Sequence, residues 1–292
     1  MTHRWKILMS LITLTLAMTM TVMSASAAYP GKNGRLTFGA RINDNVDVYT
    51  MKENGNDLRR LTDAPGFDIC AAYSPDGKDI TFCSNRTGFF EIWAMKANGS
   101  QQRQVTHLDG FATFPDYSPD GTRIAFGADS EIYVVDADGT DIVQLTTDPA
   151  IDELPAWSPS GAKIAFLSDR SGLSQIWLMD SDGSDPTQLT YDPVPKTQLP
   201  DWSPDGSQIA YADAPGDIGN IWIIDADGTD PIQLTTDPAD DFAPAWSPDG
   251  AEIAFLSTRS GIRELFVMRA DGSNQHSPLP GILAFAPGWQ PR

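Results

Sequence analysis

The sequence predicts an all-β protein, a β-propeller of six blades with four antiparallel strands each. An aromatic residue followed by Ser-Pro-Asp-Gly, or by a close or reduced copy of it, occurs at Tyr73, Tyr117, Trp157, Trp202, Trp246 and Trp289. The intervals between these marker aromatics are 44, 40, 45, 44 and 43 residues. Repeats of this length that are built from short strands are typical of propeller blades.

The fourth repeat shows the strands expected of one blade. Residues 154–157, 163–168, 175–179 and 187–190 are short segments with the composition of strands. A Ser-Pro-Ser-Gly turn at 158–161 has proline preset for its second position and glycine free to adopt a positive φ. Asp182-Gly183 supplies a tight hairpin turn between the last two segments. The repeat is therefore predicted to form one antiparallel blade.

Two further aromatic positions recur in every repeat. The second strand carries one at Phe38, Phe82, Phe126, Phe166, Tyr211 and Phe255, and the third strand carries one at Tyr49, Trp93, Tyr133, Trp177, Trp222 and Phe266. Together with the marker aromatics they are expected to pack blade against blade as core, not to form a cofactor site.

The two ends of the repeat region predict how the ring closes. The repeats begin at a second strand, and the chain ends with a spare first strand at 284–289. This last strand is expected to complete the first blade, which removes the exposed sheet edges of an open ring.

Residues 1–28 are predicted to be a secretory signal peptide that precedes a propeller domain at 29–292. Arg4 and Lys6 form a basic start, residues 7–23 are apolar, and Ala25-Ser26-Ala27 is a cleavage motif, with the cut after Ala27 or Ala28. A membrane anchor is the weaker alternative, and no later stretch is long enough to span a bilayer. The mature protein is therefore expected in the periplasm or the extracellular space.

The charge of the chain excludes two classes of partner. The formal net charge of −19 becomes −21 once Arg4 and Lys6 are removed. Such a surface repels nucleic acid and anionic membrane surfaces, while it keeps an exported protein soluble.

The two cysteines, Cys70 and Cys83, both fall in the second repeat. In the hairpin around Asp76-Gly77 they are expected to face each other, or to lie one residue off if Gly77 forms a bulge. A facing pair can close a disulfide in an oxidising compartment. The alternative is two buried thiols, because the equivalent positions Leu154 and Leu167 are apolar. Both alternatives are open at this point.

Four sequence elements recur in order in several repeats: W-S-P-D-G-x-x-I-A-F, the S-x-R-x-G loop, I-W-x-M-x-x-D-G-[ST] and Q-L-T. Over residues 30–292 the chain resembles the TolB-like, WD-like β-propeller repeat of exported bacterial proteins. The resemblance implies a six-bladed periplasmic propeller that contacts protein partners of the cell envelope. TolB carries an additional domain before its propeller, so the resemblance covers the propeller only.

The arginine of the S-x-R-x-G loop lies 13 residues after its marker aromatic, and an aspartate lies five residues before the same aromatic. Repeats that lack one of the two also lack the other. This joint presence predicts structural ion pairs between the first and second strands and argues against an anion site. The predicted pairs are Asp68–Arg86, Asp152–Arg170 and Asp241–Arg259.

The odd-numbered repeats have loops without such a pair. These loops are expected to share a face with the Asp-rich connections between blades, where propellers present variable loops for recognition. The candidate ligand- or partner-binding residues are Asp44, Asp129, Asp213 and Asp217. The alternative for each is a solvated acidic loop.

Neither a metal motif nor a catalytic motif is apparent. Asp136-Ala137-Asp138-Gly139 has the wrong spacing for a calcium loop and is expected to be a hairpin turn. Only His107 and His276 follow the signal peptide, and no H-E-x-x-H, G-x-S-x-G or phosphate loop occurs.

The sequence therefore predicts a monomeric, non-enzymatic scaffold without a cofactor, which binds a protein partner of the cell envelope or the extracellular space. One alternative is a hydrolase or lactonase-like enzyme with a divalent cation such as calcium in the central channel, near Glu153, Asp201 and Asp116. Another is a glycan-binding module that uses Phe89, Phe90 and Tyr191.

Overall fold

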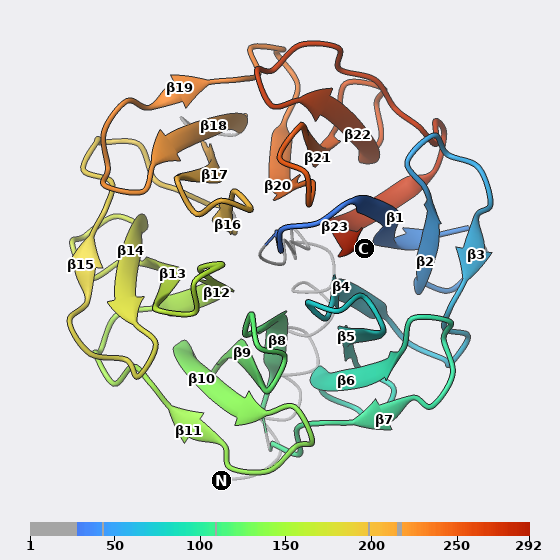
Figure 1. Cartoon of the computed structure of the whole chain (residues 1–292), viewed down its shortest axis with the longest axis horizontal. Helices are drawn as coiled ribbons and strands as arrows, with labels where there is room; N and C mark the ends of the chain where they lie inside the picture. The colour runs from blue at the N-terminus through green and yellow to red at the C-terminus, as the bar shows by residue number, and fades with distance from the viewer. Residues whose placement is uncertain (1–27, 43, 109, 198, 215–217) are drawn as a thin grey trace, which may run out of the picture.

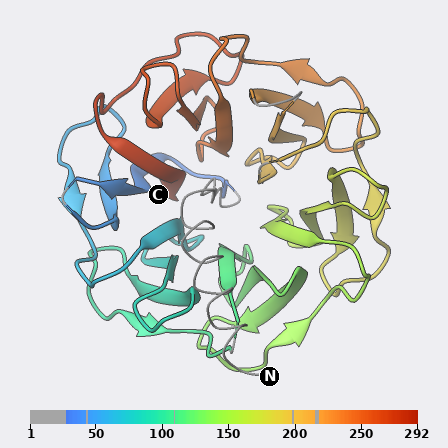
Figure 2. The ribbon, with the colours of Figure 1, turned by 180° about the vertical axis from the view of Figure 1, so that it is seen from behind.

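The protein is a ring of six β-sheets, as predicted (Figure 1). The structure is a computed structural model, and it describes residues 28–42, 44–108, 110–197, 199–214 and 218–292. The same six sheets surround the centre when the ring is seen from behind (Figure 2). No helix in the described ranges is long and apolar enough to cross a membrane.

Each sheet is one blade, with its first strand innermost. Blade 1 holds β23 (Leu283–Pro291), β1 (Asn33–Arg41), β2 (Asp47–Lys52) and β3 (Arg59–Arg60). Blade 2 holds β4 (Asp68–Tyr73), β5 (Asp79–Ser84), β6 (Glu91–Lys96) and β7 (Arg103–Gln104). Blade 3 holds β8 (Ala112–Tyr117), β9 (Arg123–Ala128), β10 (Glu131–Asp136) and β11 (Val143–Gln144).

The other three blades follow the same order. Blade 4 holds β12 (Asp152–Trp157), β13 (Lys163–Ser168), β14 (Gln175–Asp180) and β15 (Thr187–Gln188). Blade 5 holds β16 (Asp201–Trp202), β17 (Gln208–Asp213), β18 (Asn220–Asp225) and β19 (Ile232–Gln233). Blade 6 holds β20 (Asp241–Trp246), β21 (Glu252–Ser257) and β22 (Glu264–Arg269), and its outermost strand is reduced to a bridge between Val267 and His276.

The ring closes through its last strand. β23 pairs antiparallel with β1, so that Trp289 lies opposite Leu36 and Ala284 opposite Ala40. The Trp289 indole also donates a hydrogen bond to the carbonyl oxygen of Ala245 in blade 6 (3.1 Å). The predicted closure of the first blade by the C-terminal strand is confirmed.

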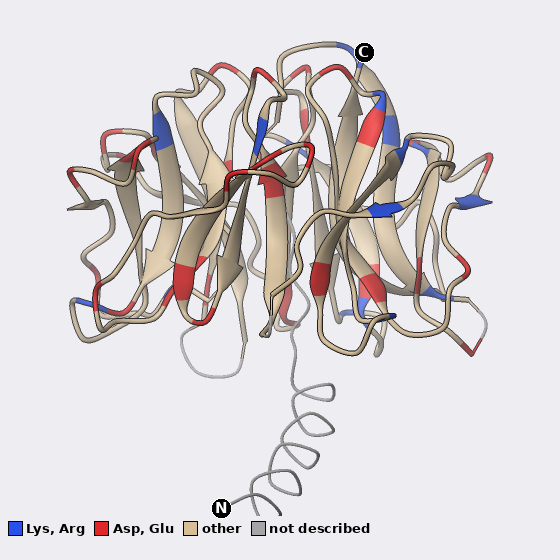
Figure 3. Ribbon diagram, turned by 90° about the horizontal axis from the view of Figure 1, so that it is seen from below, with Lys and Arg blue, Asp and Glu red and all other residues tan. Residues whose placement is uncertain are grey.

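The two ends of the ring differ in the connections they carry (Figure 3). One end, called the turn face below, carries the Ser-Pro-Asp-Gly turns and the hairpin turns between third and fourth strands. The opposite end, called the loop face, carries the loops between second and third strands and the connections between blades. This division follows from the antiparallel strand order, because successive connections of a blade alternate between its two ends.

The residues of the Ser-Pro-Asp-Gly motif meet the needs of a tight turn. In blade 2 the Ser74 hydroxyl donates to an Asp76 carboxylate oxygen (2.8 Å) and accepts from the amide of Asp79 (3.0 Å). Gly77 has a φ of 66° and donates its amide to the Ser74 carbonyl oxygen (2.8 Å). The turn therefore fixes the register of the first two strands in each blade.

A β-bulge interrupts the innermost strands. Cys70, Phe114, Leu154, Ala243 and Ala286, each three residues before a marker aromatic, have φ values of 56°, 57°, 61°, 53° and 35°. The ladder of blade 2 shifts register between Ile69 and Ala72, so Cys83 pairs with Ile69. The offset of one residue, which was one of the two alternatives for the cysteines, is therefore present, but the bulge that causes it lies at Cys70 and not at Gly77.

Cys70 and Cys83 are free, buried thiols that lie one residue out of register. Burial and the neighbouring Cys83 thiol raise the pKa of Cys70. A buried thiol with a raised pKa contains little of the reactive thiolate. In the structure the two cysteines are buried thiols, which is the second of the two alternatives given above. A disulfide in an oxidising compartment stays a prediction.

The start of the described chain runs into the centre of the ring (Figure 1). Ala28 and Tyr29 are both buried, and the Tyr29 hydroxyl donates to the Tyr117 carbonyl oxygen. The predicted signal peptide lies outside the described residues up to position 27. Of the two predicted cleavage positions, a cut after Ala27 would retain both of these packed residues.

Candidate functional site: the loop face

Three equivalent loops of the even-numbered blades each expose one apolar side chain on the loop face. Phe89, Leu173 and Ile262 follow the glycine of the S-x-R-x-G motif and are 43%, 45% and 42% exposed. The glycines before them, Gly88, Gly172 and Gly261, have φ values of 118°, 96° and 90°. A Cβ on any of these glycines would meet no atom within 4 Å. The loops therefore end in open tips that point an apolar group into solvent.

Other exposed apolar residues extend this surface. Ile151, Tyr191 and Ile218 lie in connections or loops on the same face and are 49%, 76% and 44% exposed. The remaining large exposed hydrophobics of the described residues, Leu58, Ile142, Val143 and Ile232, lie at or beside outermost strands. The loop face therefore exposes six large apolar side chains, which come from blades 2, 4, 5 and 6 and from the connections on either side of blade 4.

The predicted ion pairs anchor the three loops. Arg86 Nη2 lies 2.7 Å from Asp68 Oδ2, Arg170 Nη2 2.7 Å from Asp152 Oδ2, and Arg259 Nη2 2.9 Å from Asp241 Oδ2. The side chains of the three aspartates are fully buried, and those of the arginines are 13%, 13% and 19% exposed. All three arginines are thus committed to carboxylates within their own blade.

The environment of Arg86 shows how one loop is held. Its Nε donates to Ser84 Oγ (2.8 Å) and its Nη1 to Gln102 Oε1 (2.7 Å). The guanidinium carbon also lies 4.6 Å from the ring centroid of Trp93 and 5.4 Å from that of Phe82. Together with the ion pair to Asp68, these contacts connect the base of the loop to β4, β5, β6 and the residue before β7. The tip therefore projects from a rigid support.

Blade 5 achieves a similar contact with a lysine that the sequence prediction missed. Lys196 is buried, its ammonium lies 5.3 Å from the centroid of Tyr211, and it pairs with Asp192 (2.8 Å). Tyr211 is the counterpart of the ring that the loop arginines cover in blades 2, 4 and 6. The sequence feature that could have pointed to this contact is a single lysine in the proline-rich segment 190–200.

The four aspartates proposed from sequence have different outcomes. Asp44 is exposed, and Asp129 is exposed in a two-residue turn in which Asp129 and Ser130 have φ values of 52° and 67°. Asp213 was expected in an exposed loop but is buried at the end of β17, because Lys196 bridges to it from the neighbouring connection. Asp217 lies outside the described residues.

Acidic side chains surround the apolar tips. Asp44, Asp63, Asp129, Asp148 and Asp192 are exposed in loops and connections of the loop face. The nearby cations Arg86, Arg170, Arg259 and Lys196 each have a carboxylate partner. Figure 3 shows Asp and Glu segments at both ends of the ring. Asp192 is neutralised by Lys196, and Arg41 and Arg263 add positive charge to this face, so the exposed aspartates leave a modest excess of negative charge around the tips among the described residues.

The aromatic residues considered for glycan binding do not form one platform. Phe90 is buried, whereas Tyr191 is exposed and donates its hydroxyl hydrogen to the Gln188 carbonyl oxygen (2.8 Å). Phe89 packs edge-on against Phe111, with 5.5 Å between ring centroids. Phe89 and Tyr191 come from blade 2 and from the connection after blade 4.

Two channel carboxylates considered for an enzyme bind the backbone. Asp116 Oδ2 accepts a hydrogen bond from the Trp157 amide (2.7 Å), and Asp201 Oδ2 accepts one from the Trp246 amide (2.5 Å). Innermost strands are sheet edges whose amides need partners, and each aspartate supplies one to the next blade. Among the described residues, no three His, Cys, Asp or Glu side chains converge to hold a metal.

Asp201 makes the stability of the ring depend on pH. Burial, and then the charge of Asp116, raise the pKa of Asp201 well above its usual value. Stability that comes from a raised folded-state pKa is present below the unfolded-state pKa and is lost as pH rises through the folded-state pKa. Asp201→Asn keeps the oxygen acceptor and removes this loss.

We therefore expect the melting temperature of Asp201→Asn, relative to wild type, to rise between pH 5 and pH 8. The change corresponds to about 1.4 kcal/mol for each unit of pKa shift that falls inside the window. Thermal unfolding across this pH range measures it. A constant difference between variant and wild type would contradict the assignment.

Comparisons with known proteins agree with this architecture. A family model described as the TolB beta propeller domain matches residues 13–129, 100–212 and 194–291. The solved structure of TolB from Acinetobacter baumannii is similar with a TM-score of 0.78 and 23% identity, over 96% of this chain and 70% of that one. A comparison with curated proteins gave no match.

Two further structures share the fold. A putative TolB from Agrobacterium tumefaciens is similar with a TM-score of 0.68 and 21% identity, over 88% of this chain and 99% of that one. Oligogalacturonate lyase from Vibrio parahaemolyticus is similar with a TM-score of 0.59 and 14% identity, over 88% and 78% of the two chains. Because the family model matches nearly the whole described ring in three overlapping matches, this chain belongs to the TolB β-propeller domain family.

Proposed function

We propose that this protein is an exported, non-enzymatic scaffold that binds a protein partner through the loop face. The observation that carries the proposal is the set of apolar side chains at three equivalent loop tips, Phe89, Leu173 and Ile262. A large part of each of these side chains is exposed to solvent, although Phe89 also packs against Phe111. Burial against a partner gives them a favourable role.

The charge of the same face defines the chemistry of the partner. Exposed aspartates surround the tips, and the cations at the loop bases are already paired. A complementary partner presents apolar side chains flanked by lysine or arginine. Opposite charges on the two proteins would speed their association and favour the orientation in which these charged residues face each other.

The rigidity of the loops supports binding by a preformed surface. Each tip is held by a buried ion pair and by stacking of its arginine on two rings of the blade. A surface that is ordered before binding loses less conformational entropy when the complex forms. This suits a scaffold that recognises its partner with little rearrangement.

The central channel is assigned a structural role in this proposal. Asp116 and Asp201 accept hydrogen bonds from amides of neighbouring blades. Burial, and then the nearby charges that include Asp116 and Asp201, raise the pKa of the Tyr29 hydroxyl. We propose that the protein acts without a resident cofactor, as a monomer in the periplasm or the extracellular space. The resemblance to TolB supports an envelope role.

The proposal is tested by affinity capture from the native envelope fraction with three baits. These are the wild type, the variant Phe89→Ser/Leu173→Ser/Ile262→Ser, and the control Ile142→Ser/Val143→Ser/Ile232→Ser at the outer edge. We expect one protein to be enriched by wild type and control and lost with the loop-tip variant. The purified pair should then show Kd raised at least about tenfold by the loop-tip substitutions.

The exposed positions make the two triple variants comparable in folding. Equal melting temperatures and equal elution volumes would establish this before capture. If the enriched protein is retained by the loop-tip variant and lost with the outer-edge control, the loop face is not the binding surface.

A further inference from the structure

One strand pair of the propeller places two cations opposite each other. At the turn-face end of the second and third strands, blade 1 has Arg35 opposite Lys52. No other blade has two like charges at this position. The equivalent pairs are Asp79–Lys96, Arg123–Asp136, Lys163–Asp180, Gln208–Asp225 and Glu252–Arg269.

The difference has an energetic consequence. Opposite charges facing each other across a strand pair stabilise it, and like charges destabilise it. Asp79–Lys96 and Lys163–Asp180 are in fact ion pairs at 2.8 and 2.6 Å. In blade 1 the pair of β1 and β2 has two cations and no acidic partner at this position. An anion from outside these two strands must therefore balance their positive charge.

A pocket of about 560 Å³ lies beside these two cations, between blades 1 and 2. Its basic lining residues are Arg35, Lys52, Arg59, Arg60 and Arg292, and its single acidic lining residue is Asp57. Subtracting Arg4 and Lys6 from the 20 Lys and Arg of the chain leaves 18, so this pocket gathers five of the 18. In a chain of net charge −19 this is a concentrated positive site.

Only part of this positive charge is neutralised by the protein. Asp57 is shared by Arg35 (2.8 Å) and Arg59 (2.7 Å), which lower its pKa to about 2. Arg60 pairs with the buried Asp47 (2.7 Å). Within the described residues, no ion-pair partner is found for Lys52 or Arg292.

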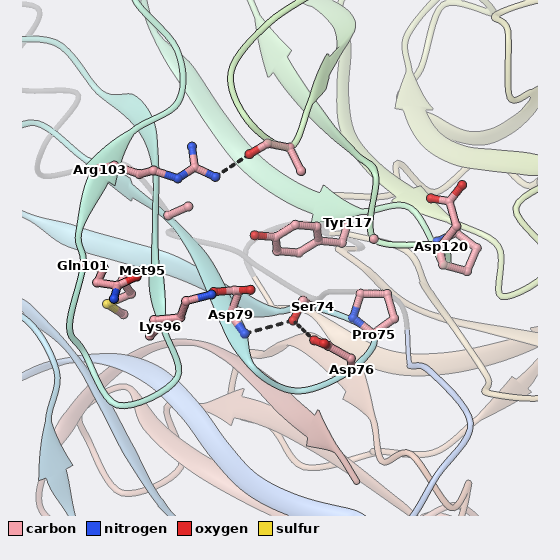
Figure 4. A pocket seen from close by; sticks show the side chains of 14 residues that line it. Ser74, Pro75, Asp76, Asp79, Met95, Lys96, Gln101, Arg103, Tyr117 and Asp120 are labelled. Carbon is pink, nitrogen blue, oxygen red and sulfur yellow. Dashed lines mark hydrogen bonds and ion pairs between the residues drawn. The ribbon is translucent and has the colours of Figure 1, made fainter.

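The next interblade pocket has a different balance of charge. The pocket between blades 2 and 3, about 530 Å³, is lined by Lys96 and Arg103 and by three aspartates, Asp76, Asp79 and Asp120 (Figure 4). Lys96 points to Asp79 there, and Arg103 donates to the Ala137 carbonyl oxygen. In that pocket the aspartates therefore balance the positive charge of Lys96 and Arg103.

We propose that the pocket between blades 1 and 2 binds a phosphorylated small molecule through its phosphate group. Lys52 and the Arg292 side chain provide uncommitted cationic donors, and charge-assisted hydrogen bonds to phosphate oxygens are the strong ones. The buried Arg35, which donates to Thr50 Oγ1 (3.2 Å), fixes the positive floor of the site. The pocket volume leaves room for the group that carries the phosphate.

The site lies on the turn face, opposite the proposed protein-binding surface, so the two proposals are tested separately. Calorimetric titration of the mature protein with inorganic phosphate and with pyrophosphate, at constant ionic strength, measures binding. We expect saturable binding of at least one of them to one site. Lys52→Gln and Arg292→Gln should each weaken it about tenfold.

Lys96→Gln is the matched control, because Lys96 is the counterpart of Lys52 in blade 2 but is paired with Asp79. It should leave phosphate binding unchanged. Absence of saturable binding up to about 10 mM of either probe, a weakness beyond the millimolar range, overturns the proposal. An equal loss of binding in Lys96→Gln overturns it as well.

Discussion

Deletion of residues 283–292, which form β23, is expected to abolish cooperative folding of the ring. The deletion removes the innermost strand of blade 1 and leaves β1 with an unpaired edge beside the buried Leu36 and Phe38. It also removes Trp289, which is 4% exposed and hydrogen-bonded to blade 6. An open propeller exposes both a sheet edge and apolar core, and such surfaces lead to aggregation.

Circular dichroism during heating and size-exclusion chromatography measure the outcome. The truncated chain should lack a sharp unfolding transition and elute as aggregate or expanded chain. Trp289→Ala, which keeps the backbone of β23, should fold but lose about 3–5 kcal/mol of unfolding free energy. A truncated chain that unfolds cooperatively as a compact monomer would show that β23 does not close the ring.

Arg86→Met is expected to cost about 3–5 kcal/mol, the range for removing one partner of a buried ion pair. The Asp68 side chain is fully buried, so among the described residues its carboxylate would keep only the Ser84 hydroxyl as a side-chain hydrogen-bond partner. Methionine retains much of the apolar contact with Trp93 and Phe82, so the loss reports the charge. Urea unfolding of the purified variant measures the free energy.

Lys78→Met is the control for this substitution, because Lys78 pairs with Asp76 at the surface, where both side chains are more than half exposed. It is expected to leave stability unchanged, since exposed pairs contribute little. Equal effects of the two substitutions would mean that the loop pairs do not anchor the blades.

The fold was predictable because the information is repeated six times. Five of the six marker aromatics are followed by the residues that a tight turn needs, and each copy places its aromatics on the same strands. The unmatched strand at 284–289 then left one way to close the ring. A single repeat whose motif was reduced as much as the one at Trp289 would not have been enough to predict the fold.

The bulge at Cys70 was not predictable, because it is a main-chain feature shared by side chains as different as cysteine, phenylalanine, leucine and alanine. None of these residues favours a positive φ. The same bulge moved Cys70 out of register with Cys83. Burial of Asp213 was missed for a related reason, since its neighbour Lys196 arrives from a connection that has no repeat pattern.

The candidate site was only partly visible in the sequence. Comparison of repeats identified the ion pairs because both partners appear and disappear together. The apolar residue after the loop glycine was present in the same three repeats, at Phe89, Leu173 and Ile262. Phe89 was considered as an exposed aromatic, but the exposure of Leu173 and Ile262 was not predicted, because apolar residues are most often buried.

The most direct test of the loop-face proposal is amide hydrogen exchange of the protein alone and in complex with its captured partner. We predict slower exchange in the complex at the loops 85–90, 169–174 and 258–263, and no change at the Ser-Pro-Asp-Gly turns on the opposite face. Protection confined to the turn face or to the outermost strands would contradict the account.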